Sequence, residues 1–412
     1  MVRLLFRALA SKARRAFKGG NLLNEPAPVA CLRKTQVDGE MYSLWMRKAI
    51  PYDLLINTVG PPKRGSGAGS KRGMNVNAIP PKKRDLYSAT IKYFGSEPEP
   101  AFEAPERLSA LWGRNWGCDN DVGALRSVLM HRPGNEFSII DRTKTIAETG
   151  TYGDLDAGWY WQSDIIPELS ELQAQHDALT DLLRREGVEV VLVEGVDGSR
   201  FKSVYTRDSC IAVKGGAIVP RLAPRMRHGE ELPVTRTLAK LGMPVLRTLH
   251  GTAMAEGGSF AWLNSKTAVI GRGIRINDDG IAQIAEVLRY QGVELIVVDL
   301  CGYDIHIDGH FLMIDVDLAL VWARGLPFSF LERLKQLGIR TIEMNEEDNP
   351  WIVNGLAIAP GRVIMPRGLS DRTREALARN RVTVLEIDYD KVQLNGGGIH
   401  CSTSPLIRDR VD

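Results

Sequence analysis

The segment LNGGGIHCSTSP, residues 394–405, places a cysteine directly after a glycine-rich turn. Gly396, Gly397 and Gly398 permit backbone angles that other residues avoid, and they let the chain approach a ligand closely. Taken alone, the segment favours a small structural cysteine that is buried after a turn. A thiol becomes a nucleophile near neutral pH only with help from a nearby cation or a positioned base. Cys401 is therefore a candidate nucleophile if such a partner comes from elsewhere in the chain.

Further polar side chains occur where strands are predicted to begin. The segment VYTRDSC places Arg207 and Asp208 just before a strand that starts at Cys210, and MAEGGSF places Glu256 before two glycines and an apolar strand. A lone aspartate in front of a strand is more often a turn cap than a catalytic group. None of these residues is decisive by itself.

The segment DIHIDGHFLMID, residues 304–315, is the densest of these polar patterns. Asp304, His306, Asp308 and His310 alternate, and in a strand all four would project from one face. Because burial without partners would be costly, they must face a polar cleft, a metal ion or a cationic substrate. No second histidine or cysteine pair with ligand spacing accompanies them. We predict neither a metal nor a cofactor, and we keep the binding of a hard cation as the minor alternative.

The elements that position these residues follow a repeated pattern. An amphipathic helix, a stop and a β-branched strand recur five times, and the stop is glycine in four copies and Asn380 in the fifth. The copies lie at residues 176–193, 234–249, 281–300, 330–345 and 373–388. Additional strands are predicted between them, at residues 210–219, 267–271, 318–323 and 355–366.

Two α/β folds fit this repeat. Five ββαβ units at a period of roughly 50 residues, a spacing typical of repeat architectures, could close into a five-bladed α/β propeller around a central active-site cleft. A doubly wound sheet would show the same alternation of helices and strands. The polar residues at the strand starts favour the ring, because only a ring brings them into one cleft.

Composition limits the class of protein. The 412 residues are 44% hydrophobic with a net charge of +3, which gives no reason to expect a nucleic-acid partner. Five scattered cysteines without a CxxC pair argue against a disulfide framework and against a zinc site. No apolar run is long enough to cross a bilayer. We expect a cytoplasmic protein.

The first hundred residues differ from the rest. Residues 1–24 hold no acidic residue and form a basic amphipathic leader, and residues 25–102 read as a poorly ordered basic linker region before a catalytic domain at 103–412. The leader has three interpretations. It is an organellar transit peptide or a segment that contacts an anionic membrane weakly, or it is a solvated basic tail.

Four motifs occur in the same order in successive repeats: YTRDS, EGGSF, HID and GGGIHCSTSP. As a set they resemble the guanidine-modifying (pentein) superfamily of arginine deiminases, dimethylarginine dimethylaminohydrolases and amidinotransferases, over residues 123–412. The resemblance implies a five-bladed propeller. It also implies that Cys401 is the nucleophile, that His306 is the general acid/base, and that Glu256, Asp208 and Asp308 grip a guanidinium group.

The resemblance also implies a set of substrate-binding residues. Arg275, in GRGIRINDDGI, falls where a deiminase arginine binds the substrate's α-carboxylate, and Arg225 or Arg227 offers a second clamp unless that loop is simply exposed. Such a clamp favours an amino acid over agmatine. Ser259 departs from the pattern, since hydrolases of the superfamily usually carry an aspartate there. The remaining predicted substrate-binding residues are Arg207, Gly397 and Gly398.

The predicted function is that of a cysteine-dependent hydrolase. It would release citrulline and ammonia from arginine, or citrulline and an alkylamine from a methylated arginine, through a covalent amidino-type intermediate on Cys401. Two alternatives stay open: an amidinotransferase that uses an acceptor amine, and a non-catalytic propeller that binds a partner.

His400 is a weaker candidate for the base than His306 if residues 400 and 401 are extended, because adjacent side chains then point apart. We also expect a homo-oligomer.

Overall fold

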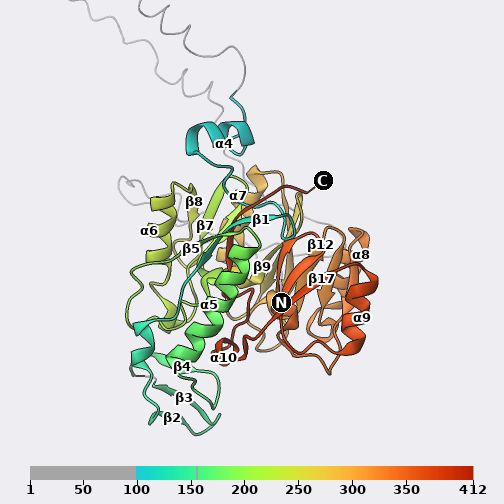
Figure 1. Ribbon diagram of the computed structural model, residues 1–412. Coiled ribbons are helices and arrows are strands. Elements are labelled where there is room, and N and C mark those ends of the chain that lie inside the picture. The colour runs from blue at the N-terminus through green and yellow to red at the C-terminus, as the bar shows by residue number, and fades with distance from the viewer. Residues whose placement is uncertain (1–98, 155, 412) are drawn as a thin grey trace, which may run out of the picture. The chain divides into compact units, whose positions relative to one another are not determined.

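The computed structural model describes residues 99–154 and 156–411 of the chain (Figure 1). Five of its three-stranded sheets share one topology, in which the first strand is antiparallel to the second and the second is parallel to the third. A helix connects the second strand to the third, so that each sheet and its helix form a ββαβ blade. The predicted five-bladed α/β propeller is confirmed, and the doubly wound sheet is excluded because the sheets are separate.

Four blades follow one another in chain order. Blade two contains β6 (Ile211–Val213), β7 (Gly216–Val219), α6 (Glu231–Leu241) and β8 (Val245–Thr248). Blade three contains β9 (Phe260–Asn264), β10 (Thr267–Arg272), α7 (Asp278–Tyr290) and β11 (Glu294–Asp299). Blade four contains β12 (Phe311–Asp315), β13 (Leu318–Val321), α8 (Phe328–Gln336) and β14 (Arg340–Glu343). Blade five contains β15 (Leu356–Ala359), β16 (Arg362–Pro366), α9 (Asp371–Arg379) and β17 (Thr383–Ile387).

Blade one joins the two ends of the described chain. Its elements are β1 (Leu125–Met130), α5 (Leu169–Arg185), β5 (Glu189–Leu192) and β18 (Ser404–Arg408). In β1, Leu129 pairs with Ser404 on the antiparallel side and with Val191 on the parallel side. The last strand therefore closes the ring. This closure also brings the segment before β18, which carries the cysteine loop, beside the strands of the other blades.

The local sequence explains why each blade has its helix and final strand. In α7, Ile281, Ile284 and Leu288 are buried at helical spacing, and Asn277 caps the first turn by accepting a hydrogen bond from the backbone N–H of Gly280 at 2.9 Å. Gly292 follows the helix with φ +68, in the left-handed region that favours glycine. The chain then turns back as β11, parallel to β10.

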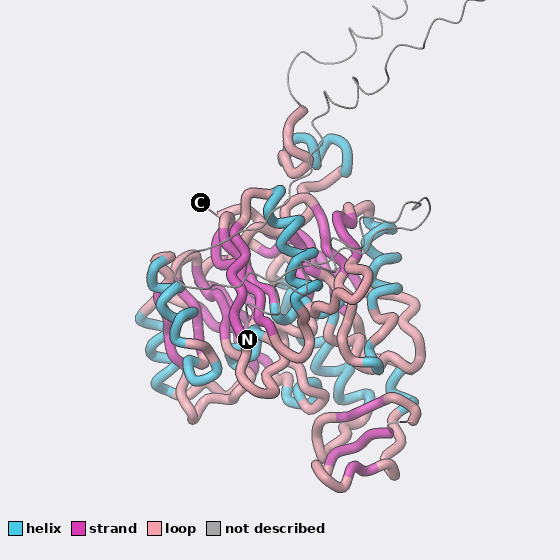
Figure 2. Tube along the Cα trace, turned by 180° about the vertical axis from the view of Figure 1, so that it is seen from behind, coloured by secondary structure: helices cyan, strands magenta, loops and turns pink. Residues whose placement is uncertain are grey.

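A sixth sheet was not predicted from the sequence. It contains β2 (Thr145–Ile146), β3 (Thr151–Asp154) and β4 (Trp159–Trp161), all between β1 and α5. It packs through a small aromatic cluster of Trp159, Trp161 and Phe201. Figures 1 and 2 show this sheet at the end of the domain opposite to α4 (Pro105–Trp112). In Figure 1 the short helix α10 (Asp390–Gln393) is labelled next to β4.

The predicted leader and nearly all of the predicted linker lie outside the described residues, so the proposed boundaries at residues 24 and 102 stay predictions. The first described helix begins at Pro105. Within residues 99–411, residue 155 aside, no helix is both long enough and apolar enough to span a bilayer.

Candidate active site

Short turns at the start of the blades position the candidate site. A single 3₁₀ turn precedes the first strand of each of four blades: η3 (Thr206–Ser209), η5 (Gly257–Ser259), η6 (Ile307–Gly309) and η8 (Ile352–Asn354). A turn at residues 399–402 occupies the same place before β18. These turns are in contact with one another, η3 with η5, η5 with η6, and η6 with η8. Side chains from five distant segments therefore meet at one end of the ring.

The alternating residues at 304–310 do not form a strand, and this prediction was wrong. His306 has extended backbone angles, but η6 follows it at once and β12 begins only at Phe311. The 3₁₀ turn rotates the later side chains away from a common face. As a result His310 pairs with Asp304, Nε2 to Oδ2 at 3.1 Å, whereas His306 and Asp308 are buried in the site.

The Cys401 thiol lies against a buried carboxylate. Its Sγ is 3.5 Å from Oδ2 of Asp308, and Nδ1 of His400 lies 2.8 Å from the same oxygen. Residues 400 and 401 form part of a turn, so the argument that their side chains point apart was wrong. Of these two residues, Cys401 lines the cavity described below and His400 does not, although it is also buried. Burial and the nearby Arg207 lower the pKa of His400, which leaves it neutral and able to donate to Asp308.

The surroundings of Cys401 favour the thiol over the thiolate. Burial raises the pKa of Cys401 well above its usual value, and the carboxylates of Asp308 and Asp208 raise it further. Burial alone would also raise the pKa of Asp308, but hydrogen bonding to His400 and the charges of His306 and Arg207 lower it. A cation that enters beside these two carboxylates would offset their effect on the thiol. The site therefore couples thiolate formation to the binding of a positive group.

His306 is held between two carboxylates. Its Nε2 lies 2.7 Å from Oε2 of Glu256, and its Nδ1 lies 3.6 Å from Oδ1 of Asp208. Burial alone would lower the pKa of His306, but Asp208 and Glu256 outweigh burial and raise it. An imidazolium at this position can donate a proton to a group bound in the cavity.

Glu256 is fully buried and does not line the cavity. Its carboxylate accepts hydrogen bonds from His306, from Nη1 of Arg275 at 2.9 Å, and from the backbone N–H of Ala223 at 3.0 Å. Burial alone would raise the pKa of Glu256, but the hydrogen bond and charge of His306, with Arg227 and Arg275, lower it to about 2. The structure thus places Glu256 behind His306 and Arg275, outside the lining of the cavity, and its predicted contact with a guanidinium stays a prediction.

The cavity in front of the thiol measures about 70 Å³. Five of the predicted site residues line it: Asp208, Arg227, Arg275, His306 and Cys401.

Four predicted substrate-binding residues lie elsewhere. Arg225 is exposed in the loop after blade two's second strand. Arg207 is buried behind the site, where its backbone N–H donates to the carbonyl of Cys401 at 3.0 Å. Gly397 and Gly398 pack against neighbouring side chains: an added Cβ would come within 2.5 Å of the Tyr205 ring and 2.6 Å of Oδ1 of Asn354, respectively. These glycines permit close packing of the cysteine loop and do not line the cavity.

Several residues that the sequence did not single out complete the site. Asn354 connects three turns, because its Oδ1 accepts from the Cys401 N–H at 3.2 Å, its Nδ2 donates to the Asp308 carbonyl at 3.1 Å, and its own carbonyl accepts from the His400 N–H at 2.9 Å. The only feature of the sequence that points to Asn354 is its position just before the first strand of the fifth blade. Further residues of the cavity wall are Tyr160, Gln162, Lys202, Tyr205 and Asn395.

The residues present could also hold a divalent cation. One ligand atom each from Asp208, Glu256 and His306 lies within 4.8 Å of the others. Two of these groups are already engaged by arginines, Asp208 by Nη1 of Arg227 and Glu256 by Arg275. The prediction that the protein uses no metal stays a prediction.

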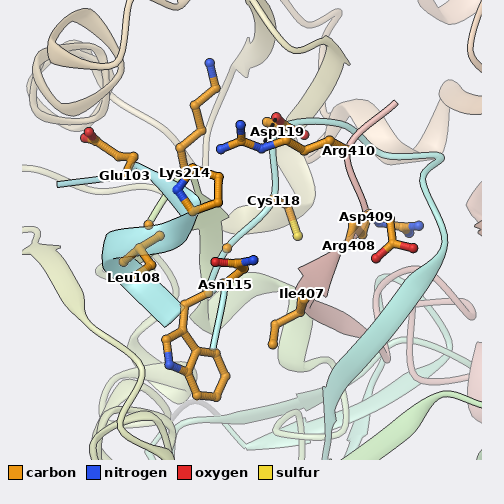
Figure 3. Close-up of a pocket in the computed structure, with 14 residues that line it drawn as sticks. Glu103, Leu108, Asn115, Cys118, Asp119, Lys214, Ile407, Arg408, Asp409 and Arg410 are labelled. Carbon is orange, nitrogen blue, oxygen red and sulfur yellow. Dashed lines mark ion pairs between the residues drawn. The ribbon is translucent and has the colours of Figure 1, made fainter. Parts of the chain in front are cut away.

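A larger cavity of about 240 Å³ lies at the other end of the ring, near α4 and the end of β18 (Figure 3). It contains the thiol of Cys118, and Figure 3 shows Lys214, Asp119 and Arg410 together on one side of it. Burial raises the pKa of Cys118 to about 12. None of the described residues that line this cavity is a histidine. The cavity therefore offers no histidine base to Cys118, and the charge of Arg408 lowers the pKa of Cys118 less than burial raises it.

The chain is similar in sequence to known enzymes. The family of eukaryotic N,N dimethylarginine dimethylhydrolases matches residues 161–408. The N(G),N(G)-dimethylarginine dimethylaminohydrolase of Pseudomonas aeruginosa is 25% identical over 238 residues, which are 57% of this chain and 88% of that enzyme. The arginine deiminase of Oenococcus oeni is 22% identical, over 71% of this chain and 97% of that enzyme. That of Mycolicibacterium gilvum is 30% identical over 129 residues, which are 29% of its length.

Solved structures show the same fold. The Pseudomonas dimethylarginine dimethylaminohydrolase, complexed with citrulline, has a TM-score of 0.55 and 21% identity, and the match covers 69% of this chain and all of that one. The inosamine-phosphate amidinotransferase of Streptomyces griseus has a TM-score of 0.57 and 15% identity, covering 72% and 97%. At these identities the likeness shows the fold alone. The family match spans more than half of this chain. The chain therefore belongs to the N,N dimethylarginine dimethylhydrolase family, within the guanidine-modifying superfamily.

Proposed function

We propose that this protein is a cysteine-dependent hydrolase that acts on the guanidinium group of arginine or of a methylated arginine. The observation that carries the proposal is that one small cavity contains the Cys401 thiol, His306 and Asp208, with Asp308 directly behind the sulfur. The names of the related enzymes support this assignment, since they include arginine deiminases and a dimethylarginine dimethylaminohydrolase.

The charge of the cavity suits a guanidinium ion. This ion is planar, and its N–H donors point outward in a fixed fork that matches carboxylate oxygens. Asp208 on the cavity wall and Asp308 behind the sulfur place two carboxylates close to the position in front of Cys401 that the substrate carbon would take. Charge-assisted hydrogen bonds to them would hold the guanidinium in place. The same positive charge would lower the pKa of the thiol, so that the nucleophile forms when substrate binds.

The proposed reaction has two steps, formation of a covalent intermediate on Cys401 and its hydrolysis. The Cys401 thiol releases its proton to solvent as the substrate binds. The thiolate attacks the central guanidinium carbon, a C–S bond forms, and the C–N bond to the terminal nitrogen breaks as His306 supplies a proton. Ammonia or an alkylamine leaves, and the rest of the substrate stays on the sulfur. Water then attacks the same carbon and gives its proton to His306. The C–S bond breaks, citrulline is released, and the leaving sulfur takes the second proton of the water, which regenerates the free cysteine.

Product analysis tests this proposal. Purified protein is incubated with arginine, with monomethylarginine and with asymmetric dimethylarginine, and the products are identified by mass. Citrulline is expected from at least one of them without an added amine. The Cys401→Ser variant should lose this activity, and the Cys118→Ser variant should keep it. Absence of citrulline and of any adduct on Cys401 with all three substrates would overturn the proposal.

The same experiment addresses the amidinotransferase alternative. An amidinotransferase would release ornithine from arginine and transfer the amidino group to an acceptor, so its turnover would depend on an added amine such as glycine. The fold is shared with amidinotransferases, which keeps this outcome open. Ornithine formation that requires glycine would replace hydrolysis as the assigned reaction.

We further propose that the protein forms a homo-oligomer, that it is cytoplasmic, and that its basic leader contacts an anionic membrane weakly. The basic character of residues 1–24 supports the last of these. Vesicle sedimentation of the full chain, with and without those residues, would test it.

A further inference from the structure

Lys202 occupies an unusual position in the wall of the active-site cavity. Its Nζ lies 5.5 Å from the centre of the Phe201 ring and 6.0 Å from that of Tyr160, and it donates a hydrogen bond to the carbonyl of Asn395. Tyr160 belongs to β4 of the extra sheet, and Asn395 belongs to the loop that leads to Cys401. The lysine is therefore fixed between two segments that both line the cavity.

The charged surroundings of Lys202 are mostly positive. Among the residues that the structure describes, none of the ion pairs involves Lys202, and Arg227 and Arg275 line the same cavity. Burial lowers the pKa of Lys202 well below its usual value, and these two guanidinium groups lower it further, with only Glu230 acting in the opposite direction. An ammonium group at Lys202 has no anionic partner among the described residues, and a bound anion would favour its charged form.

The two arginines differ in what they can still bind. Arg227 is buried, and its donors are taken by Glu230, by Asp208 and by the carbonyl of Tyr205. The Arg275 side chain is 23% exposed, and among the described residues only Glu256 engages it, through Nη1. Among the lysine and arginine side chains that line the cavity, Arg275 and Lys202 are therefore the two whose donors are not all taken by described residues.

We propose that Lys202 is a specificity-determining residue that binds the carboxylate of a guanidino acid, with Arg275 as the second donor. The inference rests on the proposed function, because it assumes that the guanidinium end of the same molecule lies at Cys401. A carboxylate at Lys202 would supply the anion that this wall lacks. Lys202 would thus add to the discrimination between guanidino carboxylic acids and guanidino amines such as agmatine.

The position of Lys202 also gives the extra sheet a role. The Tyr160 ring from β4 and the Phe201 ring hold the ammonium group by cation–π attraction, which compensates in part for its burial. The sheet thus contributes to substrate selection through the residue that it positions.

Steady-state kinetics with a matched pair of substrates tests the proposal. Arginine and agmatine share the guanidinium group and chain, and only arginine has a carboxylate. In Lys202→Met, the KM for arginine should rise about 10- to 100-fold, which corresponds to the loss of one charge-assisted hydrogen bond. Both kcat for arginine and kcat/KM for agmatine should change less than about threefold. Lys202→Arg should restore most of the affinity for arginine.

The agmatine measurement and one further variant serve as controls. Because agmatine turnover needs an intact site, unchanged agmatine kinetics show that Lys202→Met has folded. Lys240→Met, on the exposed face of α6, should behave as the wild type. An equal loss for arginine and agmatine, or an unchanged KM for arginine, would overturn the proposed role of Lys202.

A binding measurement separates this inference from the proposed function. Calorimetry on the Cys401→Ala chain compares arginine with agmatine, with and without Lys202→Met. If arginine binds more tightly than agmatine and Lys202→Met removes that difference, the inference holds even when the wild type shows no turnover, and only the proposed function fails. If arginine shows no advantage over agmatine in binding, the inference fails whatever the turnover is.

Discussion

The thiol of Cys401 lies 3.5 Å from Oδ2 of Asp308, so the candidate nucleophile shares its surroundings with a buried negative charge. This arrangement disfavours the thiolate until a cation arrives. It therefore suits a reaction whose substrate is itself a cation, and it protects the cysteine from other electrophiles when the site is empty.

Replacement of Asp308 by asparagine should affect the thiol and the turnover in opposite directions. Asparagine has the same shape but no charge, so the pKa of Cys401 should fall and iodoacetamide should alkylate the unliganded protein faster at neutral pH. The kcat/KM for arginine should fall at least about 10- to 100-fold, because the guanidinium loses a charged acceptor. Slower alkylation in Asp308→Asn would refute the role assigned to this carboxylate.

Replacement of Glu256 by glutamine should change the pH dependence of turnover. Glu256 and Asp208 raise the pKa of His306, so removing the charge of Glu256 should lower it. If protonated His306 is the acid, activity declines as pH rises through this pKa. The decline should therefore occur at lower pH in Glu256→Gln than in the wild type. A pH profile of kcat measures this, and an unchanged or upward-shifted decline would show that Glu256 does not act through His306.

A methyl group at position 397 should displace the cysteine loop. A Cβ on Gly397 would lie 2.5 Å from the ring of Tyr205, which is buried, so the ring or the loop must move. We expect Gly397→Ala to lower the free energy of unfolding by about 1–3 kcal/mol and to lower kcat. Gly198→Ala is the matched control, because nothing lies within 4 Å of the added group. Urea denaturation and kinetics of both variants check this, and equal behaviour of the two would be inconsistent with the packing described.

His176 should destabilise the protein in mild acid. Both ring nitrogens lack a hydrogen-bond partner among the described residues, and burial lowers the pKa of His176 to about 3. The unfolded chain binds a proton at His176 below about pH 6.5, whereas the folded chain stays neutral there. Stability is therefore lost as pH falls from about 6.5, by up to about 1.4 kcal/mol per pH unit.

The variant His176→Leu removes this titration. Its free energy of unfolding should decline less than that of the wild type between pH 7 and pH 5, as measured by urea denaturation at each pH. His250→Leu changes an exposed histidine and should follow the wild type. Parallel pH dependence of His176→Leu and the wild type would exclude the proposed cause.

The fold could be predicted because its signals are local. Each blade repeats a helix with one apolar stripe, a stop and a buried strand, and the repetition is visible in a single sequence. Gly292 after α7 illustrates this. Its backbone lies in the left-handed region, which favours glycine, so the residue type itself indicates where the helix ends. The sheet of β2 to β4 escaped prediction because its strands have only two to four residues, too few for a periodic pattern.

The site could be predicted in part. The motifs located Asp208, His306 and Cys401, which do line one cavity. The alternation at 304–310 misled because a single 3₁₀ turn separates His306 from His310, and sequence periodicity does not reveal so short a turn. Lys202 and Asn354 were missed because their partners are about 50 to 190 residues away, and only the closed ring brings them together.

The most direct test of the central claim is the intact mass of the protein quenched in acid during turnover of arginine. Hydrolysis through Cys401 predicts a covalent adduct equal to arginine less ammonia, located on Cys401 by peptide mapping and absent in Cys401→Ser. An adduct that carries only the amidino group, after release of ornithine, would indicate transfer instead. Citrulline formation that persists in Cys401→Ser would contradict the account.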